Sequence, residues 1–302
     1  MGKIAFVFSG QGAQHPGMAK AFYESNANVK ALFDAAEQIR PGTLAQCFEG
    51  DAETLKQTQN TQPCLYLTDL AAAIALQDAG ITPDAVAGFS LGELPALCFA
   101  GAFSAEDGFR LVCKRGEYMA DSSADASMAA VVKLSDDVVE NLCKSFAHIY
   151  PVNYNSPGQL VVAGATDELP AFSQKVKEAG GRTIPLKVSG AFHSPYMDAP
   201  AAQFAKTLDG FQMENPQIPV YANFTAQPYS NDVKSVLKEQ MNHPVRWTPT
   251  DLHMADSGID TFIECGVGST LQKLIQKIAP EKQAFAVEDP DSLQKVKEAL
   301  SC

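Results

Sequence analysis

The sequence lacks the features that mark membrane-spanning, disulfide-stabilised and metal-binding proteins. It has no apolar run of membrane-spanning length, and residues 1–8 predict a buried strand, not a secretory signal, because they are too short and lack a small-residue cleavage site. Its seven cysteines are scattered without a C-x-x-C pair, which predicts reduced thiols and a cytoplasmic location. No histidine pair has metal-ligand spacing, and no metal is expected.

Positive charge is also scarce. The chain has 23 lysines and arginines against 35 acidic residues, a formal net charge of −12, which argues against nucleic acid and anionic membrane surfaces as partners. The glycine pairs at 10–12 and 266–268 lack the third glycine in register and any P-loop lysine. We therefore expect no nucleotide cofactor. What remains is the composition of an ordinary soluble enzyme, with 46% hydrophobic residues in 302.

The most informative motif is Gly88-Phe89-Ser90-Leu91-Gly92, which fits the G-x-S-x-G turn of serine acyl-transfer enzymes. A short apolar strand (85–87) leads into it and a helix-forming run (91–100) leads out. Ser90 would then project its hydroxyl at a helix N-terminus, where free N–H groups favour a developing oxyanion. The context predicts a catalytic serine, although serine between glycines is common in ordinary loops.

Strands and helices alternate along most of the chain and predict the α/β class. Strands are expected at 3–8, 85–87, 219–224 and 260–264, and helices at 18–40, 62–79, 91–100, 105–120, 195–208, 231–241 and 270–279. This alternation favours a parallel sheet covered by helices. We expect these elements to form a large α/β-hydrolase-like subdomain from residues 1–124 and 190–302.

Residues 125–189 follow another pattern. The expected order is strand (128–132), helix (135–147), strands (150–155 and 159–164), helix (167–179) and strand (182–188). This β-α-β-β-α-β order is that of the ferredoxin-like unit. The prediction is a small ferredoxin-like subdomain inserted into the large one.

A serine nucleophile needs a base, and the chain offers five histidines. His193 stands out because it follows a strand end where the small subdomain returns to the large one, and crevices between domains favour sites. His15, His148, His243 and His253 have ordinary structural interpretations. No Asp or Glu between Ser90 and His193 announces itself as the third member of a triad, which counts against a plain hydrolase.

Several ordered motifs beyond this turn give the chain a specific resemblance, which runs from residue 3 to about 280. The motifs lie at 8–14, 17–18, 61–63, 88–93, 115–119, 153–159, 189–193, 240–247 and 264–268. With them the chain resembles malonyl-CoA:acyl carrier protein transacylases, in the acyltransferase family of fatty acid and polyketide synthesis.

The resemblance implies a role for each matching residue. Ser90 would be the nucleophile and His193 its general base, with the Gln240 side-chain carbonyl accepting the imidazole N–H. The backbone N–H groups of Gln11 and Leu91 would form the oxyanion hole. The reaction implied is a ping-pong transfer through a malonyl-serine intermediate.

The same resemblance implies the substrate contacts. Arg115 would grip the free malonyl carboxylate with two charge-assisted hydrogen bonds, Phe192 would fill space beside the substrate α-carbon, and Gln62 would belong to the substrate site. Malonyl-CoA and an acyl carrier protein are the implied partners, with the thioester as substrate and no cofactor. Without the resemblance, Arg115 would be interpreted as a solvated helix residue.

Phe89, Pro95, Val267 and Ser269 depart from the family pattern without removing a catalytic group. Carrier proteins are generally acidic, so docking on this acidic chain would need a local basic patch, for which Arg182, Lys187, Lys273 and Lys277 are candidates. Three alternatives stay open: a serine hydrolase or thioesterase, a non-catalytic carrier-binding protein, and a trans-acting acyltransferase of a polyketide pathway.

Overall fold

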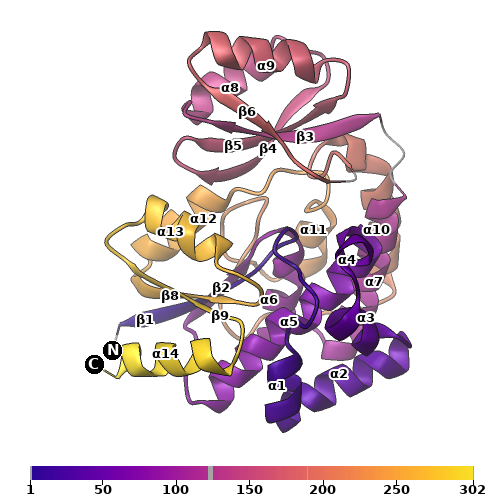
Figure 1. Cartoon of the computed structure of the whole chain (residues 1–302), viewed down its shortest axis with the longest axis vertical. Helices are drawn as coiled ribbons and strands as arrows, with labels where there is room; N and C mark the ends of the chain where they lie inside the picture. The colour runs from indigo at the N-terminus through magenta and orange to yellow at the C-terminus, as the bar shows by residue number, and fades with distance from the viewer. Residues whose placement is uncertain (1, 122–124, 189, 302) are drawn as a thin grey trace.

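The structure is a computed structural model that describes residues 2–121, 125–188 and 190–301. It holds a parallel sheet in its larger part and an antiparallel sheet at one end (Figure 1). The predicted subdomain boundaries at 124 and 189 lie outside the described residues. Six of the seven cysteines are described, and these six are free thiols.

The parallel sheet has five strands in the order β7-β2-β1-β8-β9. Its strands are β1 (Lys3–Phe8), β2 (Ala85–Gly88), β7 (Val220–Tyr221), β8 (Ile259–Cys265) and β9 (Gln283–Val287). The central strand β1 is apolar and buried from Ile4 to Phe8, as expected of a parallel strand whose two faces are both covered. Phe6 and Phe8 pack into the core on one face, and Ala5 and Val7 into the core on the other.

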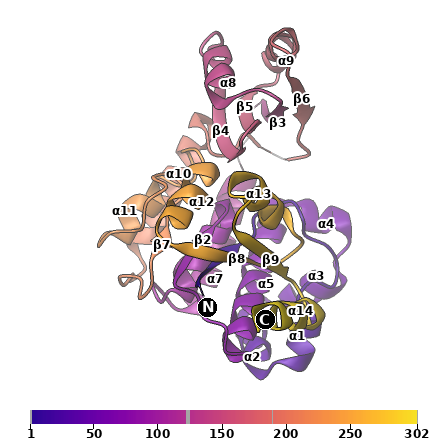
Figure 2. The same ribbon diagram turned by 90° about the vertical axis from the view of Figure 1, so that its left-hand side faces the viewer.

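Helices cover both faces of this sheet (Figure 2). The larger core holds residues of α1, α2, α5, α6, α7 and α10, and the smaller core holds residues of α12 and α13. The helices are α1 (Lys20–Ser25), α2 (Ala27–Ile39), α3 (Thr43–Glu49), α4 (Ala52–Lys56), α5 (Thr58–Asp78), α6 (Glu93–Phe99), α7 (Ala105–Ala120), α10 (Asp198–Asp209), α11 (Val233–Lys238), α12 (Trp247–Asp256), α13 (Thr270–Ile278) and α14 (Pro290–Leu300), with 3-10 turns η1 (Ser90–Gly92) and η2 (Pro195–Met197).

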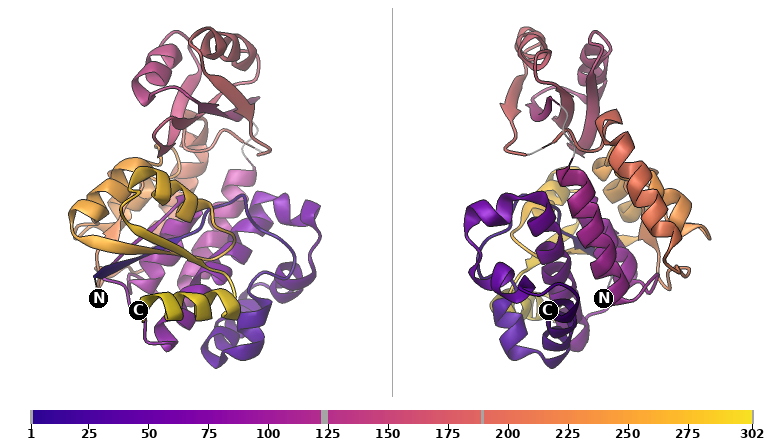
Figure 3. Two further views of the ribbon diagram at one scale, coloured as in Figure 1. Left: turned by 60° about the vertical axis from the view of Figure 1, so that its left-hand side comes forward. Right: turned by 90° about the vertical axis from the view of Figure 1, so that its right-hand side faces the viewer.

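The antiparallel sheet has the order β4-β5-β3-β6. Its elements are β3 (Ala126–Val132), α8 (Asp136–Cys143), β4 (Ile149–Ser156), β5 (Gln159–Ala165), α9 (Leu169–Glu178) and β6 (Arg182–Pro185). One face packs on α8 and α9, while Met128, Ala130, Val161 and Ala163 on the other face join the larger core. Figure 3 shows both helices on the side of this sheet that faces away from the rest of the molecule.

Two backbone hydrogen bonds join strand β4 of the antiparallel sheet to the segment before α12. Tyr154 in β4 donates its N–H to the carbonyl of Val245 over 2.9 Å, and Val245 donates its own N–H to the carbonyl of Val152 over 2.8 Å. This pairing fixes the antiparallel sheet beside the segment that leads into α12.

The α/β class and the two kinds of sheet agree with the sequence prediction, and the departures have local causes. The predicted helix at 18–40 is divided at Asn26, whose extended backbone and side chain cap α2 by accepting from Asn28 and Val29. The predicted helix at 62–79 begins earlier, at Thr58, so that Pro63 lies inside α5. The segments holding α3, α4, β9 and α14 carry regular structure that the sequence pattern did not predict.

Within the described residues, no helix is both long and apolar enough to cross a bilayer.

Candidate active site

The turn that carries Ser90 joins β2 to η1 at the carboxyl end of the parallel sheet, where ligands of open α/β sheets bind. Its flanking glycines are required by space. A Cβ on Gly88 would lie 1.9 Å from the carbonyl carbon of Gly92, and one on Gly92 would lie 2.2 Å from the carbonyl oxygen of Phe8. Ser90 itself has a φ of 54°, a left-handed conformation that costs free energy in a residue with a Cβ.

His193 lies against this serine. The Ser90 Oγ and the His193 Nε2 are 2.7 Å apart, and the imidazole is buried. Its Nδ1 lies 3.0 Å from the backbone carbonyl oxygen of Gln240 and 3.2 Å from that of His243. Carbonyl oxygens only accept, so Nδ1 carries the proton and Nε2 is free to accept from the Ser90 hydroxyl. This is the tautomer that a general base needs.

Gln240 lies beside His193, as expected, but the atom that faces the imidazole differs from the prediction. Its backbone carbonyl, not its side chain, orients His193. The side-chain Oε1 accepts from Arg115 Nη2 over 2.9 Å, and the Nε2 donates to the Ser90 carbonyl over 2.5 Å. The Gln240 side chain binds Arg115 and not His193, because an unpaired buried guanidinium costs more free energy than a buried neutral imidazole.

The pKa of His193 is lowered to about 4, first by burial and then by the positive charge of Arg115. Both causes disfavour the imidazolium. The imidazole is therefore neutral across the physiological range of pH.

Arg115 extends from α7 into the same site and is fully buried. Its Nη1 donates to Gln62 Oε1 over 2.9 Å, and its Nη2 lies 3.3 Å from Ser90 Oγ. Its Nε is buried without a hydrogen-bond partner among the described residues. Burial lowers the pKa of the guanidinium to about 10, against the opposing charge of Glu93. The arrangement is a buried cation beside the Ser90 hydroxyl, with an N–H donor that no described residue accepts.

A cavity of about 100 Å³ opens beside Ser90. The other predicted site residues that line it are Gln11, Gln62, Leu91, Phe192 and His193. Leu91 lies in the first turn of a helical segment, where backbone N–H groups have no intrahelical acceptor. The oxyanion-hole roles of Gln11 and Leu91 remain predictions.

A second cavity of about 290 Å³ shares Gln11, Phe89, Asn153 and Leu186 with the first. It lies between the glycine-rich loop after β1, helix α13 and the antiparallel sheet, so it extends the first cavity along the junction of the two sheets. Val267 lines it, and Phe89 packs on Trp247 with ring centroids 5.4 Å apart. Both residues that depart from the family pattern therefore lie near the site, and altered packing there remains a prediction.

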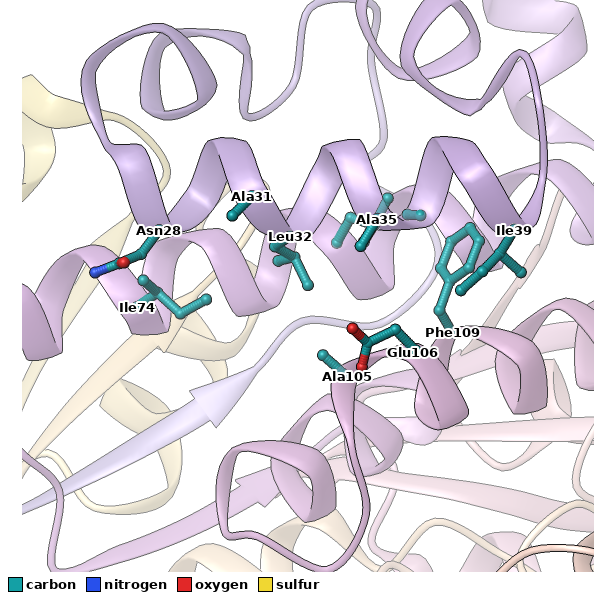
Figure 4. A pocket seen from close by; sticks show the side chains of 11 residues that line it. Asn28, Ala31, Leu32, Ala35, Ile39, Ile74, Ala105, Glu106 and Phe109 are labelled. Atoms are coloured by element: carbon teal, nitrogen blue, oxygen red, sulfur yellow. The ribbon is translucent and has the colours of Figure 1, made fainter.

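Another hollow, of about 280 Å³, lies between α2, α5 and α7 (Figure 4) and shares no lining residue with the two cavities near Ser90. Leu32, Ile39, Ile74 and Phe109 are among its apolar lining residues, with Glu106 at one edge. It is a packing crevice between helices, and its lining residues include no pair of hydroxyl and imidazole like that of Ser90 and His193.

Sequence reasoning missed two buried residues of the site. Asn223, just after β7, accepts from the Ser90 N–H over 2.7 Å and donates to the Gly88 carbonyl over 2.6 Å. Glu93 accepts from the Asn223 N–H over 3.3 Å and from the Tyr229 hydroxyl, and burial raises its pKa to about 7. Glu93 lies inside the quoted 88–93 motif, whereas Asn223 had no local signal.

The assembled geometry can be compared with known proteins. The model of the acyl transferase domain family matches residues 5–293. The chain belongs to the acyl transferase family. Within this family, it is 37% identical to a malonyl CoA-acyl carrier protein transacylase of Bacillus subtilis, over 97% of this chain and 96% of that protein. It is also 37% identical to a polyketide biosynthesis malonyl CoA-acyl carrier protein transacylase of the same organism, over 93% of this chain and 99% of the relative.

Solved structures of acyl transferases share the fold throughout. The malonyl CoA-acyl carrier protein transacylase of Clostridium perfringens superposes with a TM-score of 0.96 at 32% identity, covering 99% of this chain and 97% of that one. A malonyl-transacylase in complex with a type II polyketide acyl carrier protein gives a TM-score of 0.94 at 32% identity, covering 98% and 99%.

Proposed function

We propose that the protein transfers a malonyl group from coenzyme A to the phosphopantetheine thiol of an acyl carrier protein. The observation that carries this proposal is the buried Arg115 guanidinium, 3.3 Å from the hydroxyl of Ser90. An acyl group without a free carboxylate would offer that buried cation no charged partner from the substrate. A malonyl group supplies a carboxylate at the end of the acyl chain opposite the thioester.

In the first half-reaction, His193 Nε2 takes the proton of Ser90 as Oγ attacks the thioester carbonyl carbon. The oxyanion would be held by the N–H groups of Gln11 and Leu91. The C–S bond then breaks, and the coenzyme A sulfur leaves with the proton from His193. The product is a malonyl ester of Ser90.

In the second half-reaction, the carrier thiol gives its proton to His193 and its sulfur attacks the ester carbonyl carbon. The C–O bond breaks, and Ser90 recovers the proton from His193. Gln62 and the Gln240 side chain hold Arg115 through both steps, at 2.9 Å each, so the malonyl carboxylate has a fixed partner.

The larger cavity suits the pantetheine arm that both thioesters share. Asn153 and Asn155 line it, and their Oδ1 atoms are buried without a hydrogen-bond partner in the described part of the chain. Amide N–H groups of a pantetheine would satisfy these acceptors. The Arg182, Lys187, Lys273 and Lys277 side chains are exposed on β6, the segment after it and α13, and Lys187 and Lys273 are close in sequence to Leu186, Leu271 and Leu274, which line this cavity. They are our candidates for contacts with an acidic carrier.

We assign 1–124 and 190–302 to an α/β-hydrolase-like catalytic subdomain and 125–189 to a ferredoxin-like subdomain, with the acyl group bound where they meet. The relatives include a malonyl CoA-acyl carrier protein transacylase and a polyketide biosynthesis enzyme of the same activity, and fatty acid synthesis is our assignment. We expect the reaction to need neither metal nor cofactor.

The test is malonyl transfer to a phosphopantetheinylated carrier protein, with acetyl-CoA in parallel. We expect transfer from malonyl-CoA, much weaker transfer from acetyl-CoA, and loss of both in Ser90→Ala. Hydrolysis without transfer would identify a thioesterase, and no reaction of Ser90 with either thioester would identify a non-catalytic carrier-binding protein.

A further inference from the structure

The Asn223 side chain occupies an unusual place beside the nucleophile. Its Oδ1 accepts the N–H of Ser90 over 2.7 Å, and its Nδ2 donates to the carbonyl of Gly88 over 2.6 Å. The residue is 1% exposed. One side-chain amide therefore binds backbone groups on both sides of the turn that carries Ser90.

The sheet explains why a side chain is needed there. Strand β7 pairs with β2 only at Val86–Val220 and Ala87–Tyr221. Beyond these pairs the β7 chain turns back, with the Ala222 N–H donating to the Gln227 carbonyl over 3.0 Å. The Asn223 amide has the donor and acceptor of a peptide group, and it continues the ladder for the backbone N–H of Ser90 and the backbone carbonyl of Gly88.

The backbone of Asn223 is itself held. Its N–H donates to Glu93 Oε2 over 3.3 Å, and its carbonyl accepts from the Arg246 N–H over 2.9 Å. Glu93 also binds the Tyr229 hydroxyl. The Asn223 amide is thus pre-positioned by the buried Glu93 carboxyl and the Arg246 backbone N–H, and Asn223 does not line the cavity beside Ser90.

The conformation that this amide holds is strained. Ser90 has a φ of 54°, and such a conformation persists only where the surroundings over-determine it. The same φ directs Oγ to within 2.7 Å of His193 Nε2. A small displacement of a reacting atom can cost about 10²-fold in rate.

We infer that Asn223 is a positioning residue for acyl transfer, whose side-chain amide locks the peptide groups around Ser90 so that Oγ stays aligned with His193. The inference rests on the proposed function only in taking Ser90 as the nucleophile.

The experiment compares Asn223→Ala and Asn223→Asp with the wild type. Rates of Ser90 labelling by a fluorophosphonate and of single-turnover acylation by malonyl-CoA are measured, together with KM and thermal unfolding. Asn26→Ala is the matched control, because Asn26 also accepts two backbone N–H groups but caps α2, away from the site. We expect Asn223→Ala to lower both Ser90 rates about 10- to 100-fold with little change in KM, whereas Asn26→Ala lowers only the unfolding temperature.

The aspartate variant gives a readout that a merely structural role would not produce. A protonated carboxyl can both accept from Ser90 and donate to Gly88, whereas the carboxylate can only accept. Burial favours the protonated form. The ratio of the Asn223→Asp rate to the wild-type rate should therefore rise severalfold as the pH is lowered from about 8 to about 5.5.

Labelling rates within twofold of wild type in Asn223→Ala, or a flat pH ratio in Asn223→Asp, would overturn the inference. If the alanine variant does not fold, the pH ratio decides. Because fluorophosphonate labelling needs no malonyl group, a protein that labels at Ser90 yet transfers no malonyl would refute the proposed function and leave this inference standing.

Discussion

The two sheets divide the work of the site unequally. Ser90, His193, Gln240 and Arg115 all belong to the part built on the parallel sheet, where two of these residues have left-handed backbones and one is a fully buried cation. The antiparallel sheet and its flanking segments contribute cavity walls, among them Met128 and Leu186.

The comparison of the two sheets shows where backbone strain and buried charge are tolerated in this molecule. Arg115 and Glu93 are fully buried in a part of the molecule whose core covers both faces of a sheet. Burying charge is costly unless hydrogen bonds and opposite charge compensate it. The chemistry is therefore concentrated where packing is most extensive, and the second sheet encloses it.

The largest effect should follow from removing the nucleophile. Ser90→Ala leaves no oxygen to form the ester, so kcat for malonyl transfer should fall by about 10⁴-fold or more. Exposed Ser145 on the antiparallel side provides the control, and Ser145→Ala should transfer at the wild-type rate. Both rates are measured with one carrier protein, and substantial transfer by Ser90→Ala would remove Ser90 from the mechanism.

Arg115→Ala should reduce kcat/KM for malonyl-CoA by about 10- to 150-fold, because it removes charge-assisted hydrogen bonds to the substrate carboxylate. Activity toward acetyl-CoA should not fall in parallel. Arg110 is on the same helix but half exposed and paired with Asp107, so Arg110→Ala is the matched control. Equal losses of kcat/KM for malonyl-CoA and acetyl-CoA would show that Arg115 supports the site without binding the substrate carboxylate.

The pH dependence tests the electrostatics of the buried site. The pKa of His193 is lowered to about 4 in the folded protein, so the acid limb of kcat/KM should lie near that value, well below the usual range of histidine. In Arg115→Ala the limb should move to higher pH, because one cause of the lowering is removed. An acid limb near the ordinary value in both proteins would contradict this account.

The lowered pKa of His193 also makes the free energy of unfolding depend on pH. The unfolded chain binds more protons than the folded one between the ordinary histidine pKa of 6.5 and about 4, so this contribution to the free energy of unfolding is lost as the pH falls through that window. Glu93 acts oppositely. Its pKa is raised from 4.5 to about 7, so its contribution is lost as the pH rises through that interval. Denaturant titrations of wild type and Glu93→Gln at several pH values should show the second effect disappear in the variant.

The smallest effect should come from the exposed bases. Replacing Arg182, Lys187, Lys273 and Lys277 with glutamine should raise KM for the carrier protein a few-fold at low salt, with kcat for malonyl-CoA hydrolysis unchanged. The effect should vanish as salt is raised. An unchanged KM at low salt would exclude these four residues as the docking surface.

The sequence predicted features with a local signal. The strand, turn and helix around Ser90 follow from glycine spacing and an apolar run, and His193 was singled out by its place in the chain. The structure brings both together at 2.7 Å. The atom of Gln240 that faces His193 could not be predicted, because the direction of a backbone carbonyl is not specified by residue type.

Asn223 and Glu93 escaped prediction for a related reason. Asn223 acts through backbone groups of residues 88 and 90, which come near it only when β7 pairs with β2. The predicted helix boundaries were wrong for a more local reason. Asn26 ends one helix and caps the next, and a continuous apolar pattern across it hides that break.

The most direct test of the central claim is the intact mass of the protein after mixing with malonyl-CoA or acetyl-CoA, with Arg115→Ala alongside. The account predicts a malonyl adduct on Ser90 in the wild type, little acetyl adduct, and a malonyl adduct that fades in the variant. Equal malonyl and acetyl adducts, unaffected by Arg115→Ala, would contradict it.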